Sequence, residues 1–182
     1  MINGINSREM ILEILLEIEE GEHSHVAIRN ALSKYQFLPK QDRAFITRVC
    51  EGTLEYRIQI DYIINSFSKV TVDKMKPAIR EILRSAVYQL KYMDSVPDSA
   101  VCNEAVKLAQ RKGFYNLKPF VNGVLRTIAR EMDQVRFPQK EDDLLKYLSV
   151  KYSMPEVLVT KVAGSLWRRN NREDTGGFSY GT

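Results

Sequence analysis

The residues best suited to chemistry lie in one short loop, where cations alternate with aromatic rings around Gly113. They are Arg111, Lys112, Phe114, Tyr115, Asn116 and Lys118. Lysine and arginine neutralise phosphates, and exposed aromatic rings stack on unpaired bases. The loop therefore predicts contact with single-stranded RNA. For the three cations, an ordinary charged surface is the alternative interpretation.

Other reactive side chains are interpreted as structural. His23 and His25 lie near a helix start and could touch a metal ion, but histidines in a surface loop are far more common without one. The glutamates within 19–22 fit a solvated helix end better than acid catalysis. Cys50 and Cys102 lie inside helical patterns, which predicts buried free thiols rather than a disulfide or a metal site. No catalytic constellation is therefore expected.

Two amphipathic helices must position the loop. Pro97 suits the first position of the helix before it, because proline lacks an N–H that would be unpaired there. Gly113 ends that helix, since glycine tolerates positive φ, and Pro119 opens the next one. Apolar residues recur at helical spacing in both: Val101, Ala105, Leu108 and Ala109 in the first, and Phe120, Val121, Val124, Leu125 and Ile128 in the second.

The rest of the chain shows the same period. No window alternates convincingly with a period of two, so we predict an all-α fold. Asn6 or Ser7 caps the first helix, which Gly21 ends. Gly52 allows a close helix crossing or a break. Further helices are expected at 24–35, from 41 past Gly52, at 60–67, from Pro77 through Leu90 and at 141–152, with a linker at 136–140.

Composition agrees with a helical domain but does not specify its function. The chain has 182 residues, of which 44% are hydrophobic, and this is enough for one domain with a core. A net charge of +4 favours a polyanionic partner. The N-terminus lacks the apolar run of a signal peptide, and no segment reaches the roughly 20 apolar residues of a membrane span. We expect a cytoplasmic protein without membrane association.

The loop and its helices also carry a family resemblance. DSAVCNEAVKLAQRKG at 98–113, followed by FVNGVLR at 120–126, resembles the NusB-type all-α RNA-binding fold. The chain is more closely similar to the N-terminal domain of the RsmB (Sun/Fmu) ribosomal RNA cytosine-5 methyltransferases. Three further segments agree, at 42–64, 82–100 and 148–159. The last of them, LSVKYSMPEVLV, favours the methyltransferases because free-standing NusB lacks it.

The resemblance implies a domain organisation. It predicts a NusB-like bundle of about seven helices plus a short C-terminal extension. The expected parts are an RNA-binding domain at 1–135, a linker at 136–164 that begins the connection to a methyltransferase domain, and a tail at 165–182. The tail is polar and Gly-rich. We therefore expect it to be poorly ordered and hypothesise that it is a frameshifted or truncated product.

The same resemblance implies that this chain has no catalytic activity of its own. The family's methyl transfer needs a cysteine in a Pro-Cys context and a doubly wound sheet that holds S-adenosylmethionine. Neither Cys50 nor Cys102 follows a proline, and no Gly-rich turn after a strand is present. We therefore expect no cofactor in this chain, and S-adenosylmethionine only in the missing catalytic domain.

The resemblance also implies which residues bind RNA. Asn116, Lys118 and Phe120 match the family's RNA-facing loop and helix start, although Phe120 also fits core packing. Arg8 is the single cation left of an arginine run that contacts RNA in NusB-type proteins. Together with Arg111 and Lys112 these residues form the predicted site. Two further pairs, Asn103–Glu104 and Asn122–Gly123, are interpreted as structural, Gly123 permitting close helix packing.

The most favoured function is an RNA-binding module. It would position small-subunit ribosomal RNA for its own C-terminal methyltransferase domain. One alternative is a NusB-type transcription antitermination factor, against which the Tyr152–Pro155 extension argues. Another is a protein-interaction module without RNA affinity. A homodimer stays open, because some relatives of the fold pair up.

Overall fold

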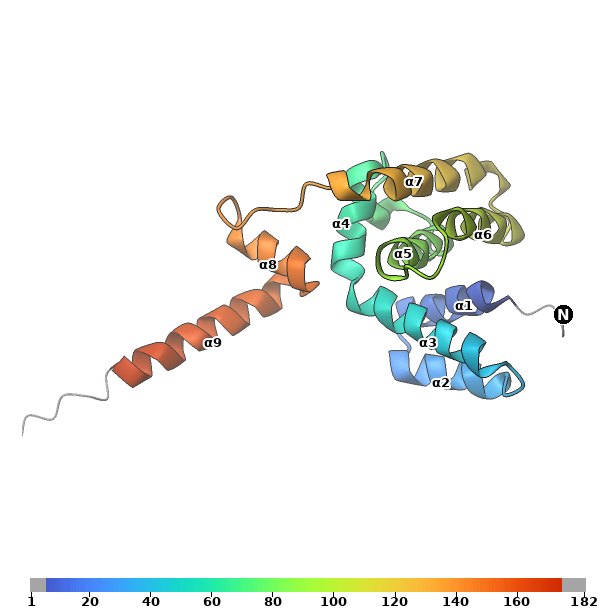
Figure 1. Cartoon of the computed structure of the whole chain (residues 1–182). Coiled ribbons are helices and arrows are strands. Elements are labelled where there is room, and N and C mark those ends of the chain that lie inside the picture. Colours follow the sequence, from blue (N-terminus) through green and yellow to red (C-terminus); the bar gives the residue numbers. More distant parts are fainter. Residues whose placement is uncertain (1–5, 175–182) are drawn as a thin grey trace, which may run out of the picture. The chain divides into compact units, whose positions relative to one another are not determined.

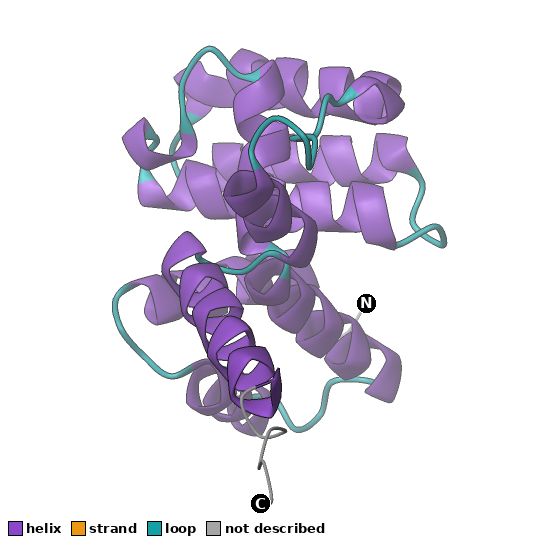
Figure 2. Cartoon of the chain, turned by 90° about the vertical axis from the view of Figure 1, so that its left-hand side faces the viewer, coloured by secondary structure: helices purple, strands orange, loops and turns teal. Residues whose placement is uncertain are grey.

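The computed structural model describes residues 6–174, and it describes side chains as far as residue 166. Within that range there is no strand, and nine α-helices alternate with loops and three short 3-10 helices (Figures 1 and 2). The predicted all-α class is confirmed. The helices are α1 Ser7–Glu19, α2 Ser24–Lys34, α3 Lys40–Glu55, α4 Arg57–Phe67, α5 Pro77–Tyr92, α6 Asp98–Arg111, α7 Lys118–Glu131, α8 Leu144–Tyr152 and α9 Glu156–Asp174.

Local sequence signals set most helix ends. The Asn6 side chain accepts a hydrogen bond from the Arg8 backbone N–H at 2.9 Å and caps α1. Gly21 and Gly113 both follow helix ends with positive φ, at 116° and 87°. Pro77 occupies the first turn of α5 as predicted. The prediction for Pro97 is wrong by one residue, because Pro97 caps α6 and the helix begins at Asp98.

Helix α5 lies at the centre of the bundle. It packs against α1, α3, α4, α6 and α7, and it is buried along nearly its whole length. The side chains that fill the core around it are mostly aliphatic. The largest of the fully buried ones are Ile11, Leu12, Ile14, Leu15, Ile46, Ile60, Ile63, Ile64, Ile79, Ile82, Leu83 and Leu125. Burial of these stripes, rather than propensity alone, holds such short helices together.

Two glycines behave differently from each other. Gly52 is buried where α3 crosses α5, and a Cβ there would lie 2.0 Å from the Tyr88 ring. The predicted close crossing is therefore confirmed. Gly123 is exposed on α7, and a Cβ there would meet nothing within 4 Å. The prediction that Gly123 permits close packing is wrong, because it lies on the polar face of its helix.

The chain divides into two compact units, Met1–Val135 and Arg136–Thr182. The first holds α1–α7, and the second holds α8 and α9. Asp143 caps α8 by accepting from the Lys146 N–H at 2.9 Å. Helix α9 continues to Asp174 and so extends into the tail at 165–182, whose expected poor order stays a prediction. No Gly or Pro occurs from Ser165 to Asp174, so nothing there breaks the helix. Residues 175–182 lie outside the described residues.

None of the described helices is long and apolar enough to cross a membrane.

Candidate nucleic-acid interface

Helices α6 and α7 form a polar groove on the first unit. The two helices pack together and are joined by the cationic and aromatic loop, which includes a short 3-10 turn at Tyr115–Leu117. The groove has a volume of about 560 Å3. Its lining consists of Asn103, Val106, Lys107 and Gln110 from α6, and Lys118, Pro119, Asn122 and Arg126 from α7. Three of these side chains are cations and three are carboxamides.

Arg126 connects the two walls of the groove. Its Nη2 donates to Asn103 Oδ1 at 2.8 Å, across from α7 to α6. Its Nε makes a longer contact with Asn122 Oδ1, at 3.4 Å on the same helix. Lys107 donates to the Glu104 carboxylate at 2.8 Å, and this hydrogen bond lowers the pKa of Glu104. The groove lining itself includes no carboxylate, which makes it locally cationic.

The predicted site residues are divided by the fold. Of the six, only Lys118 lines the groove. Arg111, Tyr115 and Asn116 are exposed and lie between the lining residues Gln110 and Lys118 in the sequence, and Tyr115 is 61% exposed. Phe120 is half-buried, in keeping with its place at the start of an apolar stripe. The loop thus presents a free aromatic face, but that face belongs to Tyr115.

Lys112 faces away from the groove. Its Nζ lies 2.9 Å from Glu9 and 3.2 Å from Glu13, both on α1. The bond to Glu9 is the main cause that raises the pKa of Lys112. At 100° per residue, Lys112 lies about 180° around α6 from Asn103. Its charge is therefore largely balanced at the seam between α1 and α6.

Arg8 lies at that same seam and is half-buried. Its guanidinium stacks over Phe45, 5.3 Å from the ring centroid. Burial lowers the pKa of Arg8, and the Glu104 carboxylate acts in the opposite direction. The Asn6 side chain also hydrogen-bonds Glu104, so the start of α1 is fixed against α6. Arg8 is thus a positioned cation rather than a freely solvated one.

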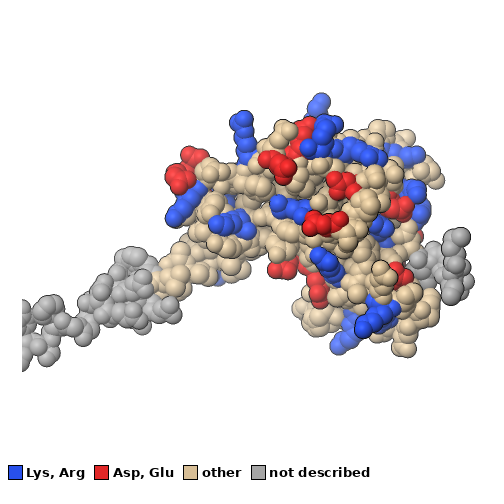
Figure 3. Space-filling model, viewed as in Figure 1, with Lys and Arg blue, Asp and Glu red and all other residues tan. Residues whose placement is uncertain are grey.

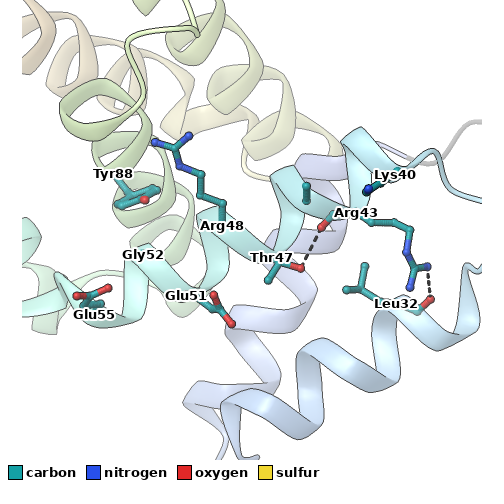
Figure 4. Close-up of a pocket in the computed structure, with 10 residues that line it drawn as sticks. Leu32, Lys40, Arg43, Thr47, Arg48, Glu51, Gly52, Glu55 and Tyr88 are labelled. Carbon is teal, nitrogen blue, oxygen red and sulfur yellow. Dashed lines mark hydrogen bonds between the residues drawn. The ribbon is translucent and has the colours of Figure 1, made fainter.

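A second depression lies along α3 and is less suited to a polyanion (Figure 4). The Arg43 side chain is already hydrogen-bonded to the end of α2, because its Nη1 donates to the Leu32 and Tyr35 carbonyls at 2.9 and 3.3 Å. Arg48 donates to the Tyr92 carbonyl at 3.1 Å. Glu51 and Glu55 also line the depression, so its charges are mixed. Figure 3 shows cationic and acidic side chains interspersed on the described part of the face in view.

Most of the residues that line the groove were not predicted from the sequence as RNA-binding residues. The notable omissions are Gln110, Lys107 and Arg126, together with Asn103 and Asn122, which were interpreted as structural. A signal was present, because 103, 107 and 110 and likewise 118, 122 and 126 are spaced as stripes on one helix face. Two polar stripes on neighbouring helices predict a shared groove only once those helices are known to pack side by side.

The remaining reactive residues do not form a site. The His23 and His25 rings stack with centroids 5.9 Å apart. Among the described residues no group of three His, Cys, Asp or Glu side chains could hold a metal ion. Cys50 and Cys102 are both buried and free, as predicted. Burial raises the pKa of both thiols, which disfavours the reactive thiolate.

Comparison with known proteins places this fold in context. The NusB family model matches residues 5–130. The crystal structure of the antitermination factors NusB and NusE in complex with dsRNA superposes with a TM-score of 0.63 at 21% identity. That match covers 68% of this chain and 93% of the other. The first unit therefore has the NusB fold.

The curated relatives include two kinds of protein. A probable ribosomal RNA small subunit methyltransferase B from Bacillus subtilis is 33% identical over 156 residues, or 86% of this chain. The chain spans about a third of that relative's length, at 34%. The transcription antitermination protein NusB from Dictyoglomus thermophilum is 33% identical over 130 residues, which is 71% of this chain and 85% of the relative.

Proposed function

This chain belongs to the NusB family, and we propose that it is an RNA-binding module of the cytoplasm. Its role is to position small-subunit ribosomal RNA for cytosine-5 methylation by a separate catalytic domain. The observation that supports the proposal most is the cationic groove between α6 and α7, with the exposed Tyr115 three residues before the lining residue Lys118. Cations and an open ring supply phosphate contacts and base stacking.

The length of the matches favours the methyltransferase context. The NusB family model ends at residue 130, whereas the methyltransferase relative aligns over 156 residues. The alignment must therefore include part of the segment that holds the linker, α8 and α9. This segment lies beyond the NusB match and is shared with the methyltransferase. Such a shared segment is expected where a module is joined to a catalytic domain. That domain is accordingly the proposed protein partner.

A transcription antitermination factor is the second candidate. Its support is the close match of α1–α7 to NusB proteins, one of which is covered over 85% of its length. Both candidates require RNA binding by the first unit, and they differ in the role of α8 and α9. Removing residues 136–182 would leave an antitermination factor's RNA affinity intact, while it would uncouple a methyltransferase module from its catalytic partner.

In this proposal S-adenosylmethionine binds to the catalytic partner, and this chain's contribution is to bind and orient the RNA. The described residues contain no strand followed by the Gly-rich turn that holds a nucleotide at a helix N-terminus.

A charge reversal in the groove tests the proposal. We expect Lys118→Glu combined with Phe120→Ala to lower affinity for a small-subunit ribosomal RNA fragment at least about tenfold, because one phosphate contact and one aromatic ring are lost. Fluorescence anisotropy over a range of salt concentrations measures the effect. The slope of log affinity against log salt should fall by about one.

The matched control lies on α2 and the turn that follows it. Lys34→Glu with Phe37→Ala makes the same change in charge and aromatic content, at an exposed lysine and a ring that is 60% exposed. Circular dichroism verifies that both variants stay helical. Equal affinity of the groove variant and the unaltered protein, or an equal loss in the control, contradicts the proposed site.

A further inference from the structure

The groove between α6 and α7 is arranged by one side chain. Arg126 Nη2 donates a hydrogen bond to Asn103 Oδ1 at 2.8 Å, and Arg126 Nε donates to Asn122 Oδ1 at 3.4 Å. A guanidinium has donors only, so the amide oxygens must face it. Each amide then directs its –NH2 group away from Arg126. One cation thereby fixes the orientation of two carboxamides on opposite walls.

The groove consequently presents hydrogen-bond donors. Besides the two –NH2 groups, the lining contains the ammonium groups of Lys107 and Lys118. Lys107 is already bound to Glu104, which leaves it two further donor hydrogens. Gln110 can act as donor or acceptor. No lining residue is a carboxylate, so a ligand that enters here meets mainly donors and needs acceptors of its own.

Nucleobases differ in this property. Guanine and uracil carry a carbonyl oxygen at the position where adenine and cytosine carry an amino group. A donor-lined groove satisfies the carbonyl and leaves an amino group opposed by other donors. An unmatched donor in a contact of this kind costs affinity, so the groove discriminates between the two classes.

We infer that the α6–α7 groove is the base-selecting part of the RNA surface, and that it takes an unpaired keto base, uracil or guanine. The inference rests on the proposed RNA-binding function. The volume of about 560 Å3 is in the range of small-ligand sites. The base must be unpaired, because the distinguishing carbonyl or amino group of a paired base lies in the deep, narrow major groove of an RNA duplex, which side chains cannot read. Asn103 and Asn122 act as the specificity-determining residues.

Competition between two oligonucleotides tests the inference. Oligo(U) and oligo(C) of equal length carry the same charge and differ in the group at position 4 of the base. We expect the protein to bind oligo(U) about five- to tenfold more tightly at fixed salt, a ratio typical of one base contact. In Asn103→Asp the oxygen facing Arg126 is kept, but the outward donor becomes an acceptor. The ratio should fall to about one or below.

Asn30→Asp is the matched control. It makes the same change at an exposed helical asparagine on α2. It should weaken both oligonucleotides equally, if at all, and leave their ratio unchanged. Asn122→Asp provides a second groove variant if circular dichroism shows that Asn103→Asp does not fold.

The outcomes separate this inference from the proposed function. A ratio lost in the groove variants but kept in Asn30→Asp supports the inference. Equal affinities for oligo(U) and oligo(C), or a ratio unchanged in both groove variants, overturns base selection while RNA binding stands. Binding of neither oligonucleotide at low salt overturns both.

Discussion

Arg84 joins two helices through a largely buried ionic network. Its Nε and Nη2 each donate to Asp61 at 2.7 Å, and its Nη1 donates to Glu81 at 2.5 Å. The Arg84 side chain is 9% exposed and that of Glu81 is fully buried. Asp61 comes from α4, so the network ties α4 to α5. A buried carboxylate of this kind is tolerated only because it is paired.

Removing the cation should therefore be strongly destabilising. We expect Arg84→Met to lower the free energy of unfolding by about 3–5 kcal/mol, because Glu81 is left buried without its partner. Urea denaturation followed by circular dichroism measures the change. Adding Glu81→Leu should recover a large part of the loss. If Arg84→Met alone has a free energy of unfolding within about 1 kcal/mol of the unaltered protein, this view of the network is contradicted.

Because of Tyr92, the free energy of unfolding is expected to fall at alkaline pH. Burial raises its pKa to about 12, with neighbouring Tyr56, Tyr88 and Glu55 acting in the same direction. The unfolded phenol titrates near 10. The neutral form is therefore favoured in the folded state. Its contribution to stability is complete below pH 10 and is lost as the pH rises through about 12.

Tyr92→Phe should flatten this dependence. We expect the melting temperature of the unaltered protein to fall more steeply than that of the variant between about pH 10 and 12, because phenylalanine cannot ionise. Tyr152→Phe is the control, since that ring is 62% exposed. Identical alkaline slopes for Tyr92→Phe and the unaltered protein would exclude Tyr92 as the titrating group.

At the scale of single residues, the sequence identified which residue types occur in the site better than it identified the role of each residue. It placed Lys118 in the loop before Pro119, whereas Lys118 is the first residue of α7, because local signals locate a helix start only to within a residue or two. It could not separate Lys118 from Lys112, since the latter is balanced by Glu9 and by Glu13, 99 positions away along the chain. Such pairs depend on which helices pack together, which periodicity does not encode. The role of each predicted residue toward RNA stays a prediction.

At the scale of elements, the two helical glycines of the first unit serve opposite needs. Gly52 allows α3 to approach α5, where the Tyr88 ring stacks near Tyr56 and Tyr92, with centroids 6.4 and 5.4 Å away. Gly123 allows no such approach. It lowers the stability of α7 and leaves an open backbone surface next to Asn122 in the groove.

Alanine substitutions should separate the two roles. We expect Gly123→Ala to raise the free energy of unfolding by about 0.5–1 kcal/mol, because alanine is the better helix former and meets no neighbour. Gly52→Ala should lower it by about 1–3 kcal/mol, because its Cβ collides with Tyr88. Urea denaturation of both variants measures the difference. Shifts of the same sign contradict the assignment.

The existence of α1–α8 could be predicted from the sequence, whereas α9 and the contacts between helices could not. The apolar stripes of α5, α6 and α7 lie in the core, because a stripe at helical spacing has few other ways to avoid water. Gly52 was predicted to allow either a close crossing or a break, of which the crossing is found, and Gly123 was wrongly assigned to close packing. Both glycines look alike in a helical pattern, and only the position of the neighbouring helix distinguishes them.

At the scale of the whole molecule, the two units differ in how well they cover their apolar residues. Unit 1 exposes few large apolar side chains among its described residues, chiefly Phe37, Val70 and Tyr115. Helices α8 and α9 expose many more for their size: Leu144, Leu145, Tyr152, Val157, Leu158, Val162 and Leu166. Concentrated apolar exposure of this kind marks interaction surfaces. The linker composition at 136–140 indicates where this change begins, but the sequence does not indicate what contacts α8 and α9.

The exposed residues of α9 should make the chain associate with itself in the absence of another partner. Leu158, Val162 and Leu166 recur at intervals of four and so form one stripe along the helix. We expect the sedimentation coefficient to rise with protein concentration, because burying this stripe against a second copy removes apolar surface from water. Leu158→Lys with Val162→Glu leaves the net charge unchanged and should abolish the rise.

A chain ending at Val135 should likewise sediment as a monomer while it keeps its melting transition, since the described core of the first unit lies within α1–α7. A concentration-independent coefficient for the full chain would mean that the stripe does not drive association, and an undiminished rise in the shortened chain would place the contact on the first unit instead.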